Sequence, residues 1–255
     1  MTDTGPDFIT VGTGAAARRI AVRARQGKGP PVVWLGGFRS DMTATKAATL
    51  DSWASKQNRA LVRFDYAGHG ASGGDFTACT ISSWLADAEA VLAAYVTKPP
   101  ILVGSSMGGW IACLAARERT ARGQKNAGLI LIAPALDFTE DLIWAQLDET
   151  GRAALMRTGI LQRPSDYAPE PDPITYALIE DGRRNRLLER PFDPRCPVHI
   201  LQGMRDPDVP YQHALKTVER LPAEGTVLTL IADGDHRLSR PQDIARLVAA
   251  VAGIV

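Results

Sequence analysis

The sequence predicts an α/β fold in which a mostly parallel sheet carries helices on both faces and a small helical insertion interrupts the alternation. Apolar runs rich in β-branched residues alternate with helical patterns along most of the chain. Several runs are apolar almost throughout, as in strands buried on both faces of a parallel sheet. With 255 residues, of which 45% are hydrophobic, the chain can form one large domain, and we expect a single domain over residues 1–255.

Seven segments have the apolar, β-branched character of strands. They begin at Ile20, Val32, Ala60, Ile101, Gly128, Val198 and Thr226. Helical patterns follow several of them. The clearest runs from Ile81 to Tyr95, where apolar residues recur at spacings of three and four and form one stripe against a sheet. Further helices are expected over 108–121, 212–221 and 243–252.

The alternation breaks once, between residues 136 and 192, where we expect no strand. Two helical patterns, over 142–156 and 174–188, flank a linker at 163–173 whose four prolines exclude a helix interior. Long insertions into compact domains usually have a function. We therefore interpret residues 136–192 as a helical cap over the main domain. An ordinary long excursion with no role in binding is the alternative.

Composition excludes several classes of protein. Lysine and arginine number 29 against 28 acidic residues, for a net charge of +1. Nucleic-acid binding usually needs a strongly positive face, so we do not expect this class of partner. The three cysteines show neither disulfide nor zinc-site spacing. No apolar run approaches the roughly 20 residues of a membrane span, and no apolar signal segment is visible near the start. We expect a reduced, cytoplasmic protein without a membrane span, and its oligomeric state is left open.

The strongest chemical signal is GSSMG at residues 104–108, which follows an apolar strand and precedes a helix. This is the G-x-S-x-G pattern in the strand–turn–helix context of a nucleophile elbow. The turn is sharp, so side chains beside the serine would clash with the neighbouring strand and helix, and Gly104 and Gly108 remove that clash. Ser106 has glycine two residues away on both sides and Ser105 does not, so Ser106 is the predicted nucleophile.

A serine nucleophile needs a positioned base, and the chain has four histidines. His69 lies in a GHGASGG turn and is a candidate for the edge of the site. His199 lies within an apolar strand and His213 on a helix, where we expect a packed residue and a surface residue respectively. His236 follows the last strand, in a loop that reaches the carboxyl edge of the sheet where ligands bind. His236 is therefore the predicted base.

The base needs an orienting carboxylate. Asp206 and Asp208 both follow the strand VHILQG, and Asp206 comes first after the strand end. Asp233 and Asp235 are too close in sequence to His236 to approach its ring easily. We expect them to stabilise the conformation of the loop instead. We favour Asp206 over Asp208.

Together these motifs resemble the α/β-hydrolase superfamily from about Ile20 to the C-terminus. The resemblance is carried by LGGF, FDYAGHGASGG, GSSMGGW, GxxDxxVP and GDH. It implies the α/β-hydrolase fold, the order Ser106, Asp206, His236, and an oxyanion hole made by the backbone N–H groups of Phe38 and Met107. Many members have His-Gly before the first donor where this chain has Gly36-Gly37, so this loop is expected to be looser.

A closer similarity is to the branch of mitochondrial palmitoyl-protein thioesterases and acyl-glucuronide esterases, and the chain resembles a bacterial relative of it. It is carried by ILVGSSMGGW, RFDYxGxGxS, GMRDPDVP, GDHRLS, the TKA after the LGGF loop, and MRTGILQRPSDY in the insertion. This resemblance implies acyl esters or acyl thioesters, free or on an acylated protein, as substrates.

We therefore predict a serine esterase or thioesterase, palmitoyl-thioesterase-like or carboxylesterase, that needs no cofactor and no metal. Carbon–carbon bond hydrolysis or peptidase activity by the same three residues is an alternative, and a non-catalytic binding protein is another. In the cap, an apolar set either lines an acyl pocket or forms cap core: Trp144, Leu147, Leu155, Met156 and Ile160. Arg183, Arg184 and Arg186 either bind an anionic group or form a solvated helical face.

Overall fold

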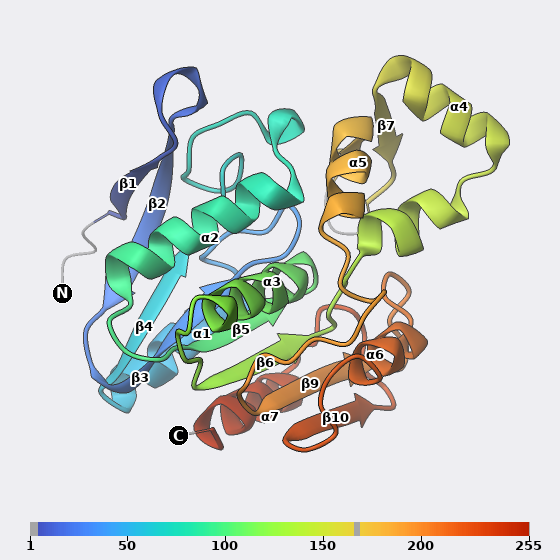
Figure 1. Ribbon diagram of the computed structural model, residues 1–255. Coiled ribbons are helices and arrows are strands. Elements are labelled where there is room, and N and C mark those ends of the chain that lie inside the picture. The colour runs from blue at the N-terminus through green and yellow to red at the C-terminus, as the bar shows by residue number, and fades with distance from the viewer. Residues whose placement is uncertain (1–4, 166–168, 255) are drawn as a thin grey trace.

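The computed structural model describes residues 5–165 and 169–254, and an eight-stranded sheet forms its centre (Figure 1). Across the sheet the strands are β1 (Asp7–Val11), β2 (Arg18–Arg25), β4 (Arg59–Phe64), β3 (Lys28–Leu35), β5 (Ile101–Ser105), β6 (Gly128–Ile132), β9 (Val198–Gly203) and β10 (Thr226–Ile231). The β1–β2 and β2–β4 pairs are antiparallel, and the other five pairs are parallel. The mostly parallel sheet is confirmed. All seven expected strands are present, and the edge strand β1 is additional.

Helices cover both faces of the sheet because its central strands are apolar on both sides. On β3, Val32 and Trp34 join one core with α1 (Thr45–Lys56) and α7 (Pro241–Ala252). Val33 and Leu35 face the other core, which also contains side chains of three further helices of the main domain. These are α2 (Ile81–Tyr95), α3 (Met107–Ala121) and α6 (Tyr211–Val218). Two short 3-10 helices, η1 (Gly14–Ala16) and η2 (Phe76–Ala78), lie in connections.

Helix boundaries agree with the sequence pattern where a local signal sets them. α2 occupies the predicted residues and begins at a capping box, in which Thr80 and Ser83 each accept the other's backbone N–H. Helix α1 was not expected. Its buried residues are Ala47, Leu50 and Ala54, a stripe too small to stand out in the sequence.

The segment 136–192, called the cap segment below, differs from its predicted form. It contains a π-helical turn η3 (Thr139–Ile143), a 3-10 turn η4 (Trp144–Gln146), α4 (Glu149–Thr158), β7 (Ile160–Arg163), β8 (Asp172–Thr175) and α5 (Tyr176–Arg184). The expectation of no strand is wrong, because β7 and β8 pair as an antiparallel hairpin. The expected helix over 142–156 is broken where Asp148 caps α4 through the Gly151 N–H.

The cap segment lies beyond the carboxyl ends of the parallel strands, on the side to which their arrows point (Figure 1). Part of the proline-rich linker, and the last two residues of the MRTGILQRPSDY stretch, fall at 166–168, outside the described residues. Among the residues that the structure describes, no helix is long and apolar enough to cross a membrane.

Candidate active site

The turn between β5 and α3 holds Ser106 at φ 55° and ψ −119°, a conformation that costs a non-glycine residue about 1–3 kcal/mol. Glycines make the turn possible. A Cβ on Gly104 would meet the backbone of Gly108, and a Cβ on Gly108 would meet the carbonyl oxygens of Leu35 and Gly36. A side chain at either glycine would therefore clash with the neighbouring backbone, as the sequence implied.

Ser106, His236 and Asp206 form one chain of hydrogen bonds. His236 Nδ1 lies 2.8 Å from Asp206 Oδ2, and His236 Nε2 lies 3.1 Å from Ser106 Oγ. Because the carboxylate can only accept, Nδ1 carries the proton and Nε2 is left to accept the serine O–H. The imidazole is thus in the tautomer that a general base for Ser106 requires. The sequence-predicted residues come together from three separate loops.

Asp206 is itself fixed by donors on three sides. Its Oδ1 accepts the backbone N–H groups of Asp208 (2.9 Å) and Val209 (2.8 Å), and its Oδ2 also accepts from the Gln202 side-chain amide (3.2 Å). The Asp206 side chain is completely buried, while that of His236 is 14% exposed. Of the two candidate carboxylates, Asp206 is therefore the partner of His236 Nδ1. Gln202, in the strand before it, was not singled out from the sequence.

One group of possible metal ligands occurs in the described part of the chain, and it is this same site. Ligand atoms of Asp206, Asp208 and His236 lie within 4.8 Å of one another. A cation there would compete with the Nδ1–H hydrogen bond that orients the imidazole. The donor set therefore fits a hydrogen-bonded base better than a metal centre.

The other three histidines lie apart from Ser106. His213 is buried, and its Nε2 lies 2.6 Å from the Leu136 carbonyl, so the expected surface position is wrong. His199 is partly buried and contacts Thr229 on β10 through a 2.8 Å hydrogen bond. His69 is buried and borders a small hollow beside Arg39.

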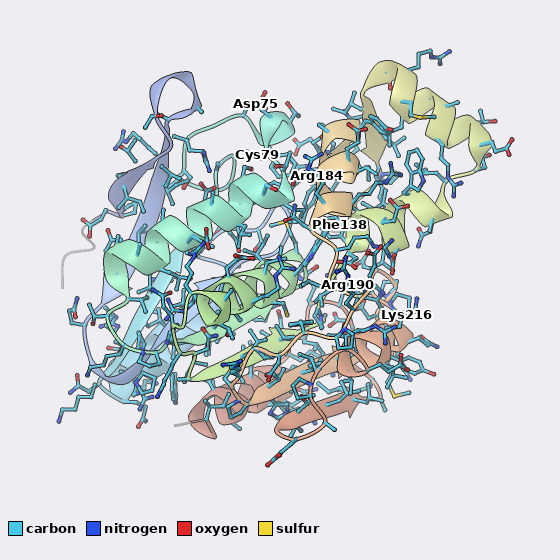
Figure 2. All side chains as sticks on the ribbon, in the orientation of Figure 1. Asp75, Cys79, Phe138, Arg184, Arg190 and Lys216 are labelled. Carbon is cyan, nitrogen blue, oxygen red and sulfur yellow. The ribbon has the colours of Figure 1, made fainter. Side chains whose placement is uncertain are left out.

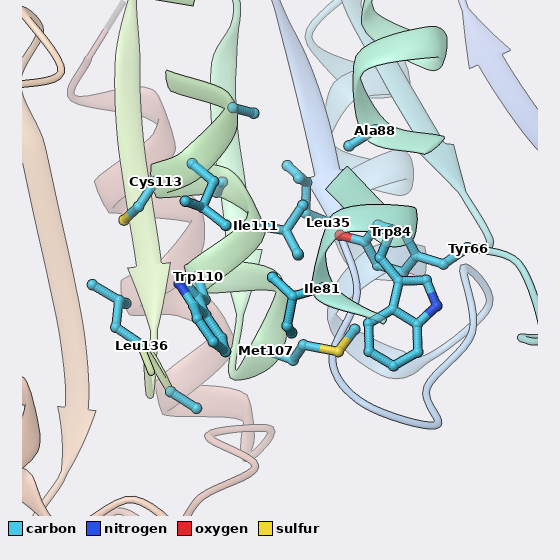
Figure 3. Close-up of a cluster of buried hydrophobic side chains, with 14 of the residues drawn as sticks. Leu35, Tyr66, Ile81, Trp84, Ala88, Met107, Trp110, Ile111, Cys113 and Leu136 are labelled. Atoms are coloured by element: carbon cyan, nitrogen blue, oxygen red, sulfur yellow. The ribbon is translucent and has the colours of Figure 1, made fainter. Parts of the chain in front are cut away.

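The predicted oxyanion donors lie beside Ser106. A Cβ on Gly37 would lie 3.5 Å from Ser106 Cβ, and the following residue, Phe38, lines the same cavity as Ser106. Met107 is the first residue of α3, so its N–H has no acceptor within the helix. Its side chain points into the core toward Trp84 (Figure 3). Both residues border the cavity that contains Ser106.

That cavity has a volume of about 360 Å³ and lies between the sheet edge and the cap segment, within the range of small-molecule sites. Ser106 and His236 open into it. Its apolar wall includes Phe38, Ala135, Phe138, Leu142, Ile143, Ile174 and Val209, and its polar wall includes Arg39, Asp41, Thr45, Lys46, Arg163, Asp172, Asp208, Arg237 and Ser239. Phe138 lies where the main domain meets the cap segment (Figure 2).

The cap residues in this wall are not those considered from the sequence. None of Trp144, Leu147, Leu155, Met156 and Ile160 lines the cavity. Leu155 is cap core and Met156 is 52% exposed. Leu142, Ile143 and Ile174 line it instead. Leu142 and Ile143 lie on the π-helical turn and Ile174 lies on the hairpin. A search for α-helical spacing of apolar residues detects neither element.

The three arginines of the cap are held by acidic neighbours rather than at the cavity. Arg183 bonds Glu140 at 2.7 Å and stacks on Trp144, and Arg184 on α5 (Figure 2) bonds Asp181 at 2.8 Å. Arg186 pairs with Asp141 at 3.0 Å. None of the three lines the cavity, so of the two alternatives the structure favours the helical face over an anionic subsite.

Lys46 is one of the cationic residues that line the cavity, with Arg39, Arg163 and Arg237. Burial, followed by the charge of Arg237, lowers the pKa of Lys46 to about 8. Its Nζ donates to the Arg237 carbonyl in the loop that carries His236. The TKA stretch marked this position in the sequence, but nothing in its spacing indicated a contact with the His236 loop.

Comparison with known sequences agrees with this geometry. The profile of the Alpha/beta hydrolase family matches residues 17–247. A Mus musculus protein, palmitoyl-protein thioesterase ABHD10, mitochondrial, is 33% identical over 237 residues, which cover 92% of this chain and 78% of the mouse protein. The Homo sapiens protein of the same name is 30% identical, covering 92% and 76%.

Two solved structures are similar throughout. A putative hydrolase from Agrobacterium vitis S4 is 53% identical with a TM-score of 0.95, and 98% of each chain is covered. Alpha/beta hydrolase domain-containing protein 10 from mouse is 30% identical with a TM-score of 0.87, again over 98% of each chain. The resemblance drawn from the motifs, to the superfamily and to its palmitoyl-protein thioesterase branch, is confirmed.

Proposed function

Because the chain belongs to the alpha/beta hydrolase family, we propose that it hydrolyses acyl esters or acyl thioesters through an acyl-enzyme formed on Ser106. His236 Nε2 takes the proton of Ser106 Oγ as the oxygen attacks the carbonyl carbon. The negative charge that develops on the carbonyl oxygen is stabilised by the backbone N–H groups of Phe38 and Met107.

The second half of the reaction uses the same groups. His236 gives its proton to the departing alkoxide or thiolate, which leaves as an alcohol or thiol, and Ser106 keeps the acyl group. A water molecule then loses a proton to His236 and attacks the acyl-enzyme, releasing a carboxylic acid and restoring the Ser106 hydroxyl. Asp206 stabilises the imidazolium formed in each half.

The observation that carries this proposal is the chain of hydrogen bonds from Asp206 through His236 to Ser106, at 2.8 and 3.1 Å. A protein that merely binds a ligand has no need of an aligned base behind a serine held at positive φ. The strained turn, the fixed tautomer and the cavity in front of the hydroxyl together favour acyl transfer.

The cavity supports an acyl chain as the recognised part of the substrate. Its apolar wall joins Phe38 and Val209 of the main domain to Phe138 and other residues of the cap segment, and an alkyl chain gains free energy by leaving water for such a surface. The relatives named palmitoyl-protein thioesterase point to long acyl thioesters. We propose that the cap segment selects the acyl group.

Hydrolysis of matched p-nitrophenyl esters and acyl-CoA thioesters, from short to long chains, tests the proposal. The Ser106→Ala variant is the control. We expect the wild type to hydrolyse long-chain thioesters best and the variant to be inactive.

A preference for short esters would make the protein a small-ester carboxylesterase and contradict the long acyl pocket. Turnover of peptides or of carbon–carbon substrates, with no ester hydrolysis, would support the alternatives that the same three residues can serve. Full activity of Ser106→Ala would exclude the acyl-enzyme.

A further inference from the structure

The loop that follows β3 carries the proposed oxyanion donor Phe38 and is called the oxyanion loop below. It contains a tight turn over residues 37–40. Ser40 N–H donates to the Gly37 carbonyl at 3.1 Å, which closes the turn. Arg39, its third residue, has φ 53°, as a type II turn requires at that position. A non-glycine residue there carries strain, and the alternative type I turn would reverse the peptide between Phe38 and Arg39.

His69 holds that peptide from behind. Its Nε2 lies 3.1 Å from the backbone N–H of Arg39, and its Nδ1 lies 3.1 Å from the Ala67 carbonyl. An amide N–H can only donate and a carbonyl can only accept, so Nε2 is unprotonated and Nδ1 carries the hydrogen. Reversing the Phe38–Arg39 peptide would break the first of these bonds and leave a buried acceptor unpaired.

The imidazole is itself rigidly placed. Aromatic rings surround it in edge-on contacts, with centroid distances of 5.1 Å to Phe76, 5.4 Å to Trp84 and 5.8 Å to Tyr66. Burial lowers the pKa of His69 to about 4, so the ring is neutral near pH 7 and Nε2 remains an acceptor. Asp65, in the same FDYAGHGASGG motif, accepts the Met42 N–H at 2.6 Å and supports the end of the loop.

We propose that His69 is a positioning residue: by holding the Arg39 N–H it fixes the Phe38–Arg39 peptide, and through Phe38 it steadies the adjoining Gly37–Phe38 peptide, whose N–H is the proposed oxyanion donor at Ser106. This inference rests on the proposed function, because it assumes that Phe38 is an oxyanion donor. This contact would also limit the looseness expected of the loop at Gly36-Gly37. The loop has no side chain there to hold it, and His69, 30 residues after Arg39, holds it instead.

Three variants separate positioning from general stability. His69→Leu keeps an apolar side chain among the rings but removes the acceptor. His69→Gln returns an oxygen near the position of Nε2. His199→Leu is the matched control, since it also removes one histidine hydrogen bond, to Thr229, but at β9, away from the residues that line the cavity.

The measurements are kcat and KM for p-nitrophenyl octanoate, and the Kd of a matching alkyl trifluoromethyl ketone, whose adduct with Ser106 carries an oxyanion. Losing an oxyanion donor outright costs about 10²–10³ in kcat. For a misplaced donor we expect His69→Leu to lose about tenfold in kcat and in ketone affinity, with KM within about twofold. His69→Gln should recover most of the loss, and His199→Leu should match the wild type.

Equal losses in His69→Leu and His199→Leu, a change in KM alone, or no rescue by His69→Gln would overturn the proposal. If His69→Leu does not fold, ¹⁵N NMR of the wild type still decides, since protonated Nε2 in His69 would contradict the required acceptor. Failure of the proposed function would appear separately, as an active Ser106→Ala variant.

Discussion

The carboxyl edge of the sheet and the cap segment both wall the cavity, but they are constrained to very different degrees. At the edge, β5 is buried at all five positions, and Gly104 and Gly108 abut backbone that cannot move aside. In the cap segment, α4 buries one of its ten residues, Leu155, and β7 buries none. We therefore expect the proposed chemistry to depend on backbone geometry and the proposed selection of the acyl group to depend on a few side chains, so substitutions in the two regions should have different kinds of effect.

The largest effect is expected at the edge, from Asp206→Asn. The amide can present its N–H to His236 Nδ1, which favours the wrong tautomer, and we expect kcat to fall by about 10⁴-fold with little change in KM. Asp208→Asn is the neighbouring control and should lose about tenfold or less, because Nδ1 donates to Asp206 Oδ2, at 2.8 Å, and that bond is kept. Equal losses in both variants would contradict the assignment of Asp206.

Gly108→Ala tests the backbone constraint without touching a reacting group. The added methyl meets the carbonyl oxygens of Leu35 and Gly36, and overpacking of this kind costs about 3 kcal/mol in the free energy of unfolding. Gly109→Ala, one residue along α3, meets Pro134 Cβ at 3.1 Å and Pro134 Cα at 3.2 Å, much milder contacts than those at Gly108, and should cost about 1 kcal/mol. Urea unfolding of the pair measures the difference. If the two variants are equally stable, the elbow is less tightly packed than its geometry implies.

Ile174→Phe should alter selection and leave the chemistry intact. A larger side chain on β8 fills part of the cavity and leaves less room for the acyl chain. The kcat/KM for long acyl chains should therefore fall by about tenfold, while that for short chains is kept. Met156→Phe enlarges a cap residue that lies outside the cavity, and it should leave chain-length preference unchanged. A uniform loss for all chain lengths in Ile174→Phe would indicate that the cap segment supports the catalytic groups instead.

The smallest effect is expected at the contact between the two regions. Arg39 reaches from the oxyanion loop to β8, 3.3 Å from Asp172 and 2.8 Å from the Pro171 carbonyl. The pair is partly exposed, so Asp172→Asn should cost about 0.5 kcal/mol and raise amide hydrogen exchange in the hairpin without affecting β5. A large loss of activity would show that the cap and the oxyanion loop are more tightly coupled than this one ion pair accounts for.

The sheet edge could be predicted from the sequence because its constraints are local. Small residues two positions either side of Ser106, a fully apolar strand before it and a helix after it leave few arrangements. Asp206 and His236 follow strands whose carboxyl ends must meet at one edge. Their catalytic roles, like the cytoplasmic location, stay predictions until they are measured.

The cap segment could not be predicted because distant contacts decide its structure. Its two strands have four residues each, one of them containing Pro173, and neither alternates clearly. His213 is buried because its partner is the carbonyl of Leu136, 77 residues earlier. The role of His69 was equally hidden, since its partner in the oxyanion loop is a backbone group and carries no residue-type signal.

The central claim, an acyl-enzyme on Ser106, is tested most directly by trapping it. The protein is mixed with p-nitrophenyl octanoate, quenched in acid within one turnover, and analysed by intact and peptide mass spectrometry beside Ser106→Ala. We predict one octanoyl group per chain, on Ser106, and none on the variant. An acyl group on Ser105 or elsewhere, or turnover of the ester with no trapped intermediate and no dependence on Ser106, would contradict the account.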